Sequence, residues 1–306
     1  VGDALGMPVE GWGHRRIAST YGWVCNMHAG WLPQGAYTDD TEMMIGIAES
    51  WLRCDGFDAE DMVRTFLQNY DPRRGYGIST LQVFELWRRG VPHEEASLRI
   101  FDGGSYGNGA AMRIAPIGLL FHDDPIQLRH YAEAVSRLTH AHPIGIEGAV
   151  LQAYAIATAV NADPQARFEP HEFVITIRNF MTAGQPELHQ ALSYVLELLD
   201  RNPTIDEVVA QLGNDTTVHR SMPTALYAFA AHWHSFEEAV SYAVNLGGDA
   251  DTIGAMTGAI AGAFHGVRAI PKRWWDAMSN EFKGRDYIVK LAQRLYELWE
   301  HKRRNS

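Results

Sequence analysis

Residues 245–266, NLGGDADTIGAMTGAIAGAFHG, contain the pattern that decides the fold. Within them Gly254, Gly258, Gly262 and Gly266 recur at every fourth position. Residues four apart lie on one face of an α-helix, where each interior glycine costs about 1 kcal/mol relative to alanine. The spacing therefore predicts a central helix with one face packed closely against another backbone, where a Cβ atom would clash.

Helical periodicity extends outward from this segment over most of the chain. Apolar residues at three- and four-residue spacings predict helices at 38–54, 58–70, 79–89, 125–139, 145–162, 171–181, 187–200, 204–212, 223–232, 236–245, 249–266 and 280–304. No clear period-two alternation is visible, so a sheet is not required. The 306 residues contain no polar linker, low-complexity tract or fixed-period repeat. We therefore expect one all-α domain, 1–306, built as a helical bundle.

Composition narrows the classes of function. The chain has 26 Lys and Arg against 37 Asp and Glu, a formal net charge of -11, which argues against broad binding to nucleic acid or anionic membranes. The apolar run 253–264 is shorter than the roughly 20 residues that span a bilayer. Two cysteines cannot build a disulfide framework, which favours a reducing, cytoplasmic compartment. The first three residues read like the middle of an element, so we expect a missing upstream segment.

Two acidic segments each precede an apolar helix. They are YTDDTE at 37–42 and GGDADT at 247–252. Each segment alone is explained equally well by helix capping, because Asp and Thr are preferred caps. Together their crowded carboxylates and hydroxyls indicate a hard cation such as Mg²⁺ or Mn²⁺, and four Asp residues could share two ions. Glu10, on a Gly- and Pro-containing segment, is a further acid that by itself would be assigned to a surface loop.

A glycine-rich segment, GGSYGNG at 103–109, is expected to open an apolar helix that includes Met112 and Ile117. Its backbone N–H groups could bind a diphosphate without a lysine. The segment is neither a Walker loop nor a Rossmann fingerprint, and a tight turn explains it almost as well. His140 and His142 lack the partners of a zinc site, which leaves contact with a polar ligand or a structural role.

Five segments give the chain a resemblance to a known family. They are GDALGMPVE (2–10), YTDDTEM (37–43), GSYGNGAAMRIAPIGL (104–119), LTHAHPIGIEGA (138–149) and residues 245–266. In this order they resemble the ADP-ribosylglycohydrolase family, which includes dinitrogenase-reductase-activating glycohydrolases and the serine- and arginine-directed ADP-ribosyl hydrolases. The resemblance implies an all-α orthogonal bundle with two Mg²⁺ or Mn²⁺ ions at the base of a cleft. The family's N-terminal helix before GDALG is absent.

The resemblance also implies the roles of individual residues. The metal ligands would be Thr38, Asp39, Asp40, Asp249, Asp251 and Thr252. Glu10 would lie beside the metals, where it can ligate them or approach the substrate. As our own hypothesis for the mechanism, Asp39 or Asp40 would orient or deprotonate the attacking water, with Glu10 as the rival base or the leaving-group acid. Substrate would be held by Gly104, Ser105, Tyr106, Gly107, Asn108 and His140, with Phe101 as an adenine-stacking aromatic.

The expected reaction is hydrolysis of the glycosidic bond between ADP-ribose and a modified protein. SYGNG at 105–109 resembles serine-directed relatives, whereas HAHP at 140–143 resembles arginine-directed ones. We favour the O-linked substrate and keep the N-linked one open. The expected partners are ADP-ribose and ADP-ribosylated protein, with no stable nucleic-acid complex and no membrane, and the expected state is a monomer. The alternatives are a structural relative without activity, a two-metal phosphoesterase, and an ADP-ribose-binding module without turnover.

Overall fold

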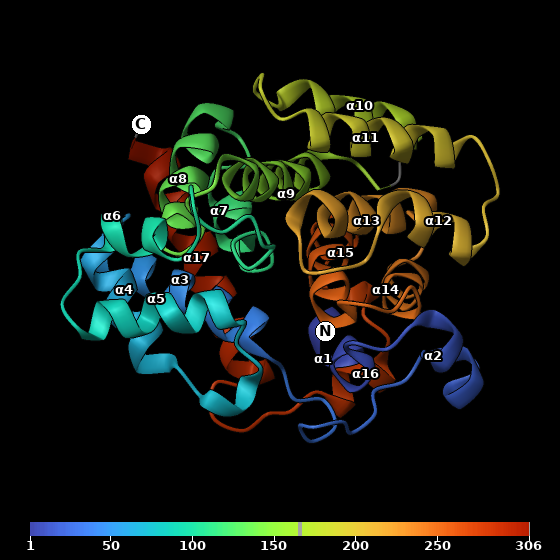
Figure 1. The fold of residues 1–306 in the computed structure, drawn as a ribbon, viewed down its shortest axis with the longest axis horizontal. Helices are drawn as coiled ribbons and strands as arrows, with labels where there is room; N and C mark the ends of the chain where they lie inside the picture. The colour runs from blue at the N-terminus through green and yellow to red at the C-terminus, as the bar shows by residue number, and fades with distance from the viewer. Residues whose placement is uncertain (165–166, 306) are drawn as a thin grey trace.

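Helix α9 (Pro143–Asn161) lies between two hydrophobic cores (Figure 1). The computed structural model describes residues 1–164 and 167–305. Leu151 and Ile156 of α9 enter one core, and Ile146 and Val150 enter the other. By length and composition alone, α9 could cross a membrane. However, 72% of its most hydrophobic window is buried inside the protein. Its composition is that of a helix shared by two cores.

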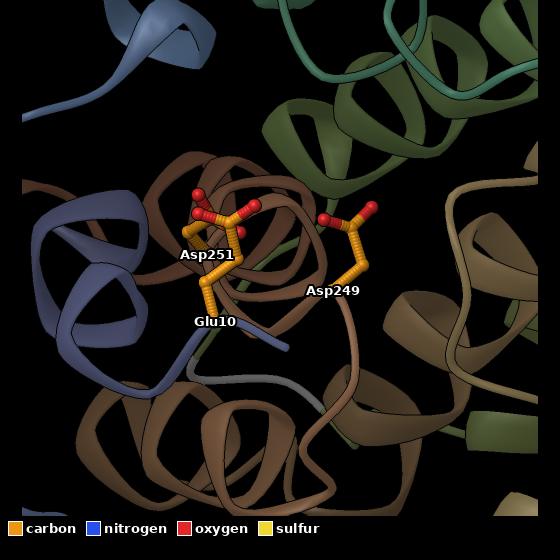
Figure 2. A group of neighbouring side chains, drawn as sticks. All are labelled: Glu10, Asp249 and Asp251. Atoms are coloured by element: carbon orange, nitrogen blue, oxygen red, sulfur yellow. The ribbon is translucent and has the colours of Figure 1, made fainter. Parts of the chain in front are cut away.

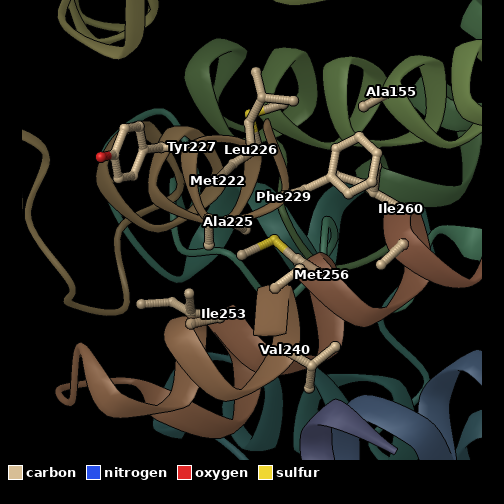
Figure 3. Packing of buried hydrophobic residues seen from close by; sticks show 14 of the residues in the cluster. Ala155, Met222, Ala225, Leu226, Tyr227, Phe229, Val240, Ile253, Met256 and Ile260 are labelled. Carbon is tan, nitrogen blue, oxygen red and sulfur yellow. The ribbon is translucent and has the colours of Figure 1, made fainter. Parts of the chain in front are cut away.

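The larger core is formed mainly by helices between residues 143 and 277 together with the start of the chain, and Figure 3 shows part of its packing. Met222 and Phe229 from one helix pack there with Met256 and Ile260 from another. The helices around this core are α1 (Gly2–Gly6), α2 (His14–Tyr21), α10 (Pro170–Phe180), α11 (Pro186–Leu199), α12 (Ile205–Leu212), α13 (Val218–Ala231), α14 (Phe236–Asn245), α15 (Ala250–His265) and α16 (Lys272–Ala277).

The second core lies on the other side of α9 and includes the fully or almost fully buried rings of Trp51, Phe66 and Phe84. Its helices are α3 (Asp39–Cys54), α4 (Ala59–Asn69), α5 (Ile78–Arg88), α6 (His93–Ala96), α7 (Ala115–Leu120), α8 (Pro125–Arg137) and α17 (Arg285–Asn305). Short 3-10 segments occupy Met7–Val9, Pro72–Arg74, Ser97–Arg99 and Val267–Ala269.

The backbones of α1 and α15 touch. A Cβ atom on Gly2 would lie 1.8 Å from the carbonyl oxygen of Gly254, and one on Gly6 would lie 2.5 Å from the Cα of Asp251. The predicted close approach is therefore real at Gly254. It does not continue along the stripe, because the nearest atom to a Cβ on Gly262 would be 3.8 Å away, and Gly266 ends the helix at a φ of +75°.

The all-α expectation is confirmed, and the described residues form only isolated β-bridges, between Gly13 and Gly247 and between Gly107 and Thr217. Some boundaries were wrong. Helix α13 begins at Val218 and keeps Pro223 inside it, because burial of the surrounding helix offsets the missing N–H group. Helix α17 begins only at Arg285, after Lys283 adopts a left-handed φ of 55°.

The start of the chain and the glycine-rich segment also differ from expectation. Residues 2–6 and 14–21 are helical although neither stretch was predicted to be. The segment 103–109 does not open a helix directly, since turns continue to residue 113 and α7 begins at Ala115. The helix N-terminus beside this segment is instead that of α9, where a Cβ on Gly145 would lie 2.7 Å from the carbonyl oxygen of Ser105.

Candidate metal centre and ligand cleft

The two acidic segments meet at one cleft, which has a volume of about 520 Å³. Helix α3 brings Asp39 and Asp40 to its lining, and α15 brings Asp251 and Thr252. The hydroxyl of Thr252 lies 3.5 Å from Oδ2 of Asp40, so the segments touch across about 210 residues of sequence. This juxtaposition is what a shared cation site requires.

Thr38 lies just behind the lining and is fully buried. Its Oγ1 donates to Oδ2 of Asp40 at 2.9 Å and accepts from the backbone N–H of Asp40 at 3.4 Å. The capping interpretation is therefore correct for this residue, which begins α3. Asp249 also stands at a helix start, but its side chain makes no capping bond to α15. Its carboxylate is available for other contacts.

Asp3 holds the first acidic segment in place. Its carboxylate accepts hydrogen bonds from the backbone N–H of Thr38 at 2.9 Å and of Thr41 at 3.2 Å, and from the Thr41 hydroxyl at 2.5 Å. Asp3 is itself fixed because α1 packs on α15 at Gly2 and Gly6. The glycine contact in the core thus sets the position of both acidic segments.

Glu10 reaches the cleft from the loop after α1. The N–H of Gly11 donates to the carbonyl of Gly248 at 2.8 Å, and the N–H of Gly248 donates to the carbonyl of Trp12 at 2.8 Å. Gly248 adopts a φ of +69°, and a Cβ there would lie 2.1 Å from the carbonyl oxygen of Asn214. This pairing brings carboxylate oxygens of Glu10, Asp249 and Asp251 within 4.8 Å of one another (Figure 2).

We call Glu10, Asp39, Asp40, Asp249 and Asp251 the cleft carboxylates. Burial raises the pKa of each of them above its usual range, and neighbouring carboxylates add to the rise for all of them. No Lys or Arg appears among the described residues that line the cleft. The lining therefore concentrates negative charge and contributes no cationic side chain to balance it.

One oxygen shows directly that this donor set is incomplete. Oδ1 of Asp40 is buried and has no hydrogen-bond partner among the described residues. An unpaired buried carboxylate oxygen is costly unless something positive lies against it. A cluster of carboxylate and hydroxyl oxygens without sulfur suits a hard divalent cation. The residues present thus fit a metal centre.

The glycine-rich loop, which we define as residues 101–109, forms another part of the lining. Gly103 and Gly104 have φ values of +80° and +91°. A Cβ on Gly104 would lie 2.8 Å from the backbone N of His142, so the loop lies directly on the start of α9. Ser105 and Tyr106 donate no backbone hydrogen bond to any described residue, which leaves their N–H groups available to a ligand.

Asn108 connects this loop to the acidic cluster. Its side-chain amide donates to Oδ2 of Asp249 at 2.5 Å and to the Ser221 hydroxyl at 3.0 Å. Its backbone N–H donates to the carbonyl of Thr216 at 2.9 Å. Asn108 was expected to hold substrate, but its amide is used to orient a carboxylate, so it acts on the acidic cluster as well as on the loop.

Two aromatic rings stand at the edge of the cleft. Phe101 is 54% exposed and Tyr106 is 45% exposed, although large apolar side chains are usually buried. The Tyr106 ring packs edge-on against His142, with centroids 5.3 Å apart. His142 accepts the backbone N–H of Ile144 at its Nδ1 and so begins α9. Both exposed rings offer flat apolar faces on which a base could stack.

His140 lies deeper, beneath the glycine-rich loop, and is 2% exposed. A Cβ on Gly109 would lie 2.7 Å from its ring, so only glycine fits above it. Burial lowers the pKa of His140 to about 3, with Arg113 adding to the shift. The ring is therefore neutral.

Sequence reasoning missed a third wall, which residues 75–80 contribute. This segment is held by Glu42, whose carboxylate accepts from the Tyr76 hydroxyl at 2.6 Å and the Asp71 N–H at 3.0 Å, and pairs with Arg74 at 2.9 Å. Glu42 belongs to the first acidic segment but faces away from the cleft. Glu42 lies three residues after Asp39, and helical periodicity puts such residues near the same face, so no local pattern predicted that Glu42 would bind residues 71–76 instead of lining the cleft.

Asp3, Ser221, Thr216 and Thr217 were also missed. Asp3 could have been noticed, since it is an acid buried within the apolar segment 2–9. Thr216 and Thr217 line the cleft because the bridge between Gly107 and Thr217 joins two segments far apart in sequence. No local pattern predicts such a pairing.

Comparison with known proteins gives one consistent result. A model of the ADP-ribosylglycohydrolase family matches residues 1–305. An uncharacterised protein from Archaeoglobus fulgidus is 38% identical, covering 97% of this chain and 93% of that protein. The ADP-ribosylhydrolase ARH3 of Homo sapiens is 32% identical, covering 86% of this chain and 79% of that protein. A solved structure described as an ADP-ribosylglycohydrolase-related protein complex superposes with a TM-score of 0.75 at 31% identity, covering 97% of this chain and 94% of that one.

Proposed function

The chain belongs to the ADP-ribosylglycohydrolase family and is a glycosyl hydrolase that acts on ADP-ribose linkages, and from this premise we propose that it releases ADP-ribose from modified proteins with the help of divalent cations. The observation that carries the proposal is the unpaired, buried Oδ1 of Asp40 inside a cluster of carboxylates. The cluster lies in the same cleft as the glycine-rich loop, so cation and substrate would meet there.

The cation ligands we propose are Asp39, Asp40, Asp249, Asp251 and Thr252, with Thr38 supporting Asp40. The most economical occupancy is two Mg²⁺ or Mn²⁺ ions, since the acids lie on two helices and share one cleft. A divalent cation supplies Lewis acidity there, which lowers the pKa of water and orients sugar hydroxyl groups. The protein contributes the fixed positions of the ligands through Asp3 and Asn108.

The opposite side of the cleft supplies contacts to the ligand. The available N–H groups of Ser105 and Tyr106, beside the start of α9, suit the diphosphate, because helix N-termini and free backbone N–H groups attract anions. The exposed rings of Phe101 and Tyr106 suit the adenine. These contacts would place the distal ribose toward the cleft carboxylates and hold it while the bond is broken.

Glu10 is our candidate for the residue that moves a proton. It is the most exposed cleft carboxylate, and desolvation raises its pKa toward the working range of a general acid or base. Asp39 and Asp40 are buried to at least nine tenths, and Oδ2 of Asp40 is already occupied by two hydroxyl groups. Cleavage would pass through an oxocarbenium-like transition state, as in other glycosidic hydrolyses.

For the leaving group we propose an O-linked serine, with N-linked arginine as the competing substrate. The support is the resemblance of residues 105–109 to serine-directed relatives and the similarity to ADP-ribosylhydrolase ARH3. Residues 140–143, which resemble arginine-directed relatives, lie at the start of α9, where His142 serves as its N-cap. That structural role explains the motif without reference to the leaving group.

The test uses two defined peptides, one ADP-ribosylated on serine and one on arginine, with Mg²⁺, with Mn²⁺ and with EDTA. We expect cation-dependent release of ADP-ribose from the serine peptide, which chromatography of the products would measure. Release from the arginine peptide alone would reverse the assignment of the leaving group. If ADP-ribose bound tightly while both peptides stayed intact, the chain would be a binding module and the proposed turnover would be wrong.

A further inference from the structure

Arg113 is fully buried beneath the cleft and has no carboxylate partner among the described residues. One terminal nitrogen, NH2, donates to the Thr139 hydroxyl oxygen at 2.7 Å and to the Val135 carbonyl at 3.3 Å. Burial lowers the pKa of Arg113 to about 9, which keeps the guanidinium charged at neutral pH. Losing a hydrogen bond from a buried charged group is costly. The bonds of Arg113 therefore hold the Thr139 hydroxyl and the Val135 carbonyl in fixed positions.

Thr139 passes this constraint to the next residue. Its Oγ1 lies 2.7 Å from Nδ1 of His140. A hydroxyl group has one hydrogen to donate, and a guanidinium can only donate, so Arg113 occupies a lone pair of Oγ1. Oγ1 makes no hydrogen bond to another acceptor in the described part of the chain. The hydroxyl hydrogen must therefore point to Nδ1 of His140, because the reverse arrangement would leave it buried without a partner.

His140 is neutral and carries one ring hydrogen, which the contact at Nδ1 assigns to Nε2. Nε2 has no hydrogen-bond partner among the described residues, and the ring belongs to the lining of the cleft. Its neighbours are Gly107 and Gly109, where ideal Cβ atoms would lie 3.4 and 3.0 Å from Nε2. The free donor thus lies directly under the glycine-rich loop.

We propose that Arg113 and Thr139 are positioning residues that hold His140 as an Nε2–H donor toward an oxygen atom of the bound ligand. The identity of that ligand as ADP-ribose rests on the proposed function. The contacts that run from Arg113 through Thr139 to His140, which we call the relay, do not depend on the proposed function, because they involve only these three side chains. The relay gives a role to a buried arginine that has no carboxylate hydrogen bond among the described residues: the fixed cation selects one tautomer of a neutral histidine.

The relay is tested by nuclear magnetic resonance of protein labelled with ¹⁵N-histidine. Long-range ¹H–¹⁵N correlations distinguish the Nε2–H from the Nδ1–H tautomer, and the His140 signals are identified by their loss in His140→Gln. In the wild type we expect the Nε2–H pattern. Thr139→Val and Arg113→Met should both shift it toward a mixture of tautomers, whereas Thr139→Ser keeps the hydroxyl and should retain it.

Ligand binding is measured on the same proteins by calorimetry with ADP-ribose and the divalent cation. Loss of one well-oriented hydrogen bond predicts a Kd raised about 5- to 10-fold in Thr139→Val, with Thr139→Ser close to the wild type. His140→Gln should bind better than His140→Leu, because the glutamine amide can supply an N–H donor near the position of Nε2. The matched control is Thr257→Val, a fully buried threonine whose hydroxyl donates to the Ala225 carbonyl away from the cleft.

Several outcomes would overturn the relay. They are an Nδ1–H pattern in the wild type, an unchanged tautomer in Thr139→Val, and a loss of affinity in Thr257→Val as large as that in Thr139→Val. If Thr139→Val does not fold, Thr139→Ser and the His140→Gln and His140→Leu pair decide the matter. A wild-type protein that fails to bind ADP-ribose would refute the proposed ligand, while the tautomer measurement would still decide whether the relay exists.

Discussion

Replacing Asp251 with Asn should have opposite effects on stability with and without a divalent cation. Carboxylate oxygens of Asp251, Glu10 and Asp249 lie within 4.8 Å of one another. At an effective dielectric constant of about 20, each pair of charges at that distance repels by roughly 3 kcal/mol. Proton uptake by the raised-pKa groups limits the cost in the metal-free protein. We therefore expect Asp251→Asn to stabilise the metal-free protein by about 1 to 3 kcal/mol.

The expected shift in melting temperature follows from the size of the protein. Unfolding of 306 residues at about 2.1 cal/mol/K per residue gives an entropy near 0.6 kcal/mol/K. In EDTA the variant should thus melt roughly 2 to 5 °C above the wild type. A cation at 100 times its Kd stabilises the wild type by about 2.7 kcal/mol, or roughly 4 °C. The variant should gain less than half of this, because it lacks one of the ligands.

The assay is thermal unfolding followed by circular dichroism, in EDTA and at increasing Mg²⁺. Glu297→Gln is the matched control, since it removes one charge from an exposed position on α17. A metal-free Asp251→Asn protein that melts below the wild type, or an equal shift of both proteins by Mg²⁺, would contradict repulsion among these carboxylates and a shared cation. The same variant should also retain less than about a tenth of wild-type turnover, a rise in barrier of at least roughly 1.4 kcal/mol.

Three further outcomes follow from the structure. Gly104→Ala, at a φ of +91° with a Cβ 2.8 Å from its neighbours, should raise the Kd for ADP-ribose in calorimetry several-fold more than Gly103→Ala, whose Cβ would have 3.6 Å of space. Gly6→Ala, whose Cβ would lie 2.5 Å from the Cα of Asp251, should lower the free energy of unfolding in urea by about 3 kcal/mol or more. Gly262→Ala, with 3.8 Å of space, should change it by less than about 1 kcal/mol or raise it. In EDTA the melting temperature should fall as the pH rises above the ordinary pKa range of Asp and Glu, about 4. The raised pKa values of the cleft carboxylates mean that the folded state binds protons more tightly than the unfolded state, so stability is lost as pH rises through those values. Saturating Mg²⁺ should flatten this slope, and a slope of opposite sign in EDTA would contradict the interpretation.

Much of the fold could be read from local patterns. The helical class, the two acidic segments and the glycine-rich loop are each contiguous in sequence, so periodicity and composition identify them. The first residues of helices were predicted less well where tertiary packing determines where the helix begins. Pro223 lies inside α13 because the core buries the helix around it, and no local rule anticipates that choice.

The contacts that support the site could not be predicted from the sequence, because they join residues that are distant along the chain. Asp3 binds backbone groups more than 30 residues away, and Asn108 binds Asp249 across 141 positions. The four-residue glycine spacing in α15 is a case in which the sequence pattern predicted more contact than the structure shows. Its period predicted close packing along the whole helix, but the partner α1 (Gly2–Gly6) is only five residues long and covers only the first part of it.

The contact between α1 and α15 packs one side of the cleft tightly against the hydrophobic core, whereas the residues on the other side are exposed and tolerate substitution. Gly2 and Gly6 leave no space between the two backbones, so Asp3 and Asp251 stay in register with the hydrophobic core. The facing wall, with Ile78, Phe101 and Tyr106, is exposed and is attached through loops. Under the proposed function, we expect substitutions at these exposed positions to alter which modified protein fits while the acidic side keeps its geometry. If the proposed function holds, selectivity would depend mainly on this exposed wall and bond cleavage on the acidic side, with Asn108 as the contact that joins them.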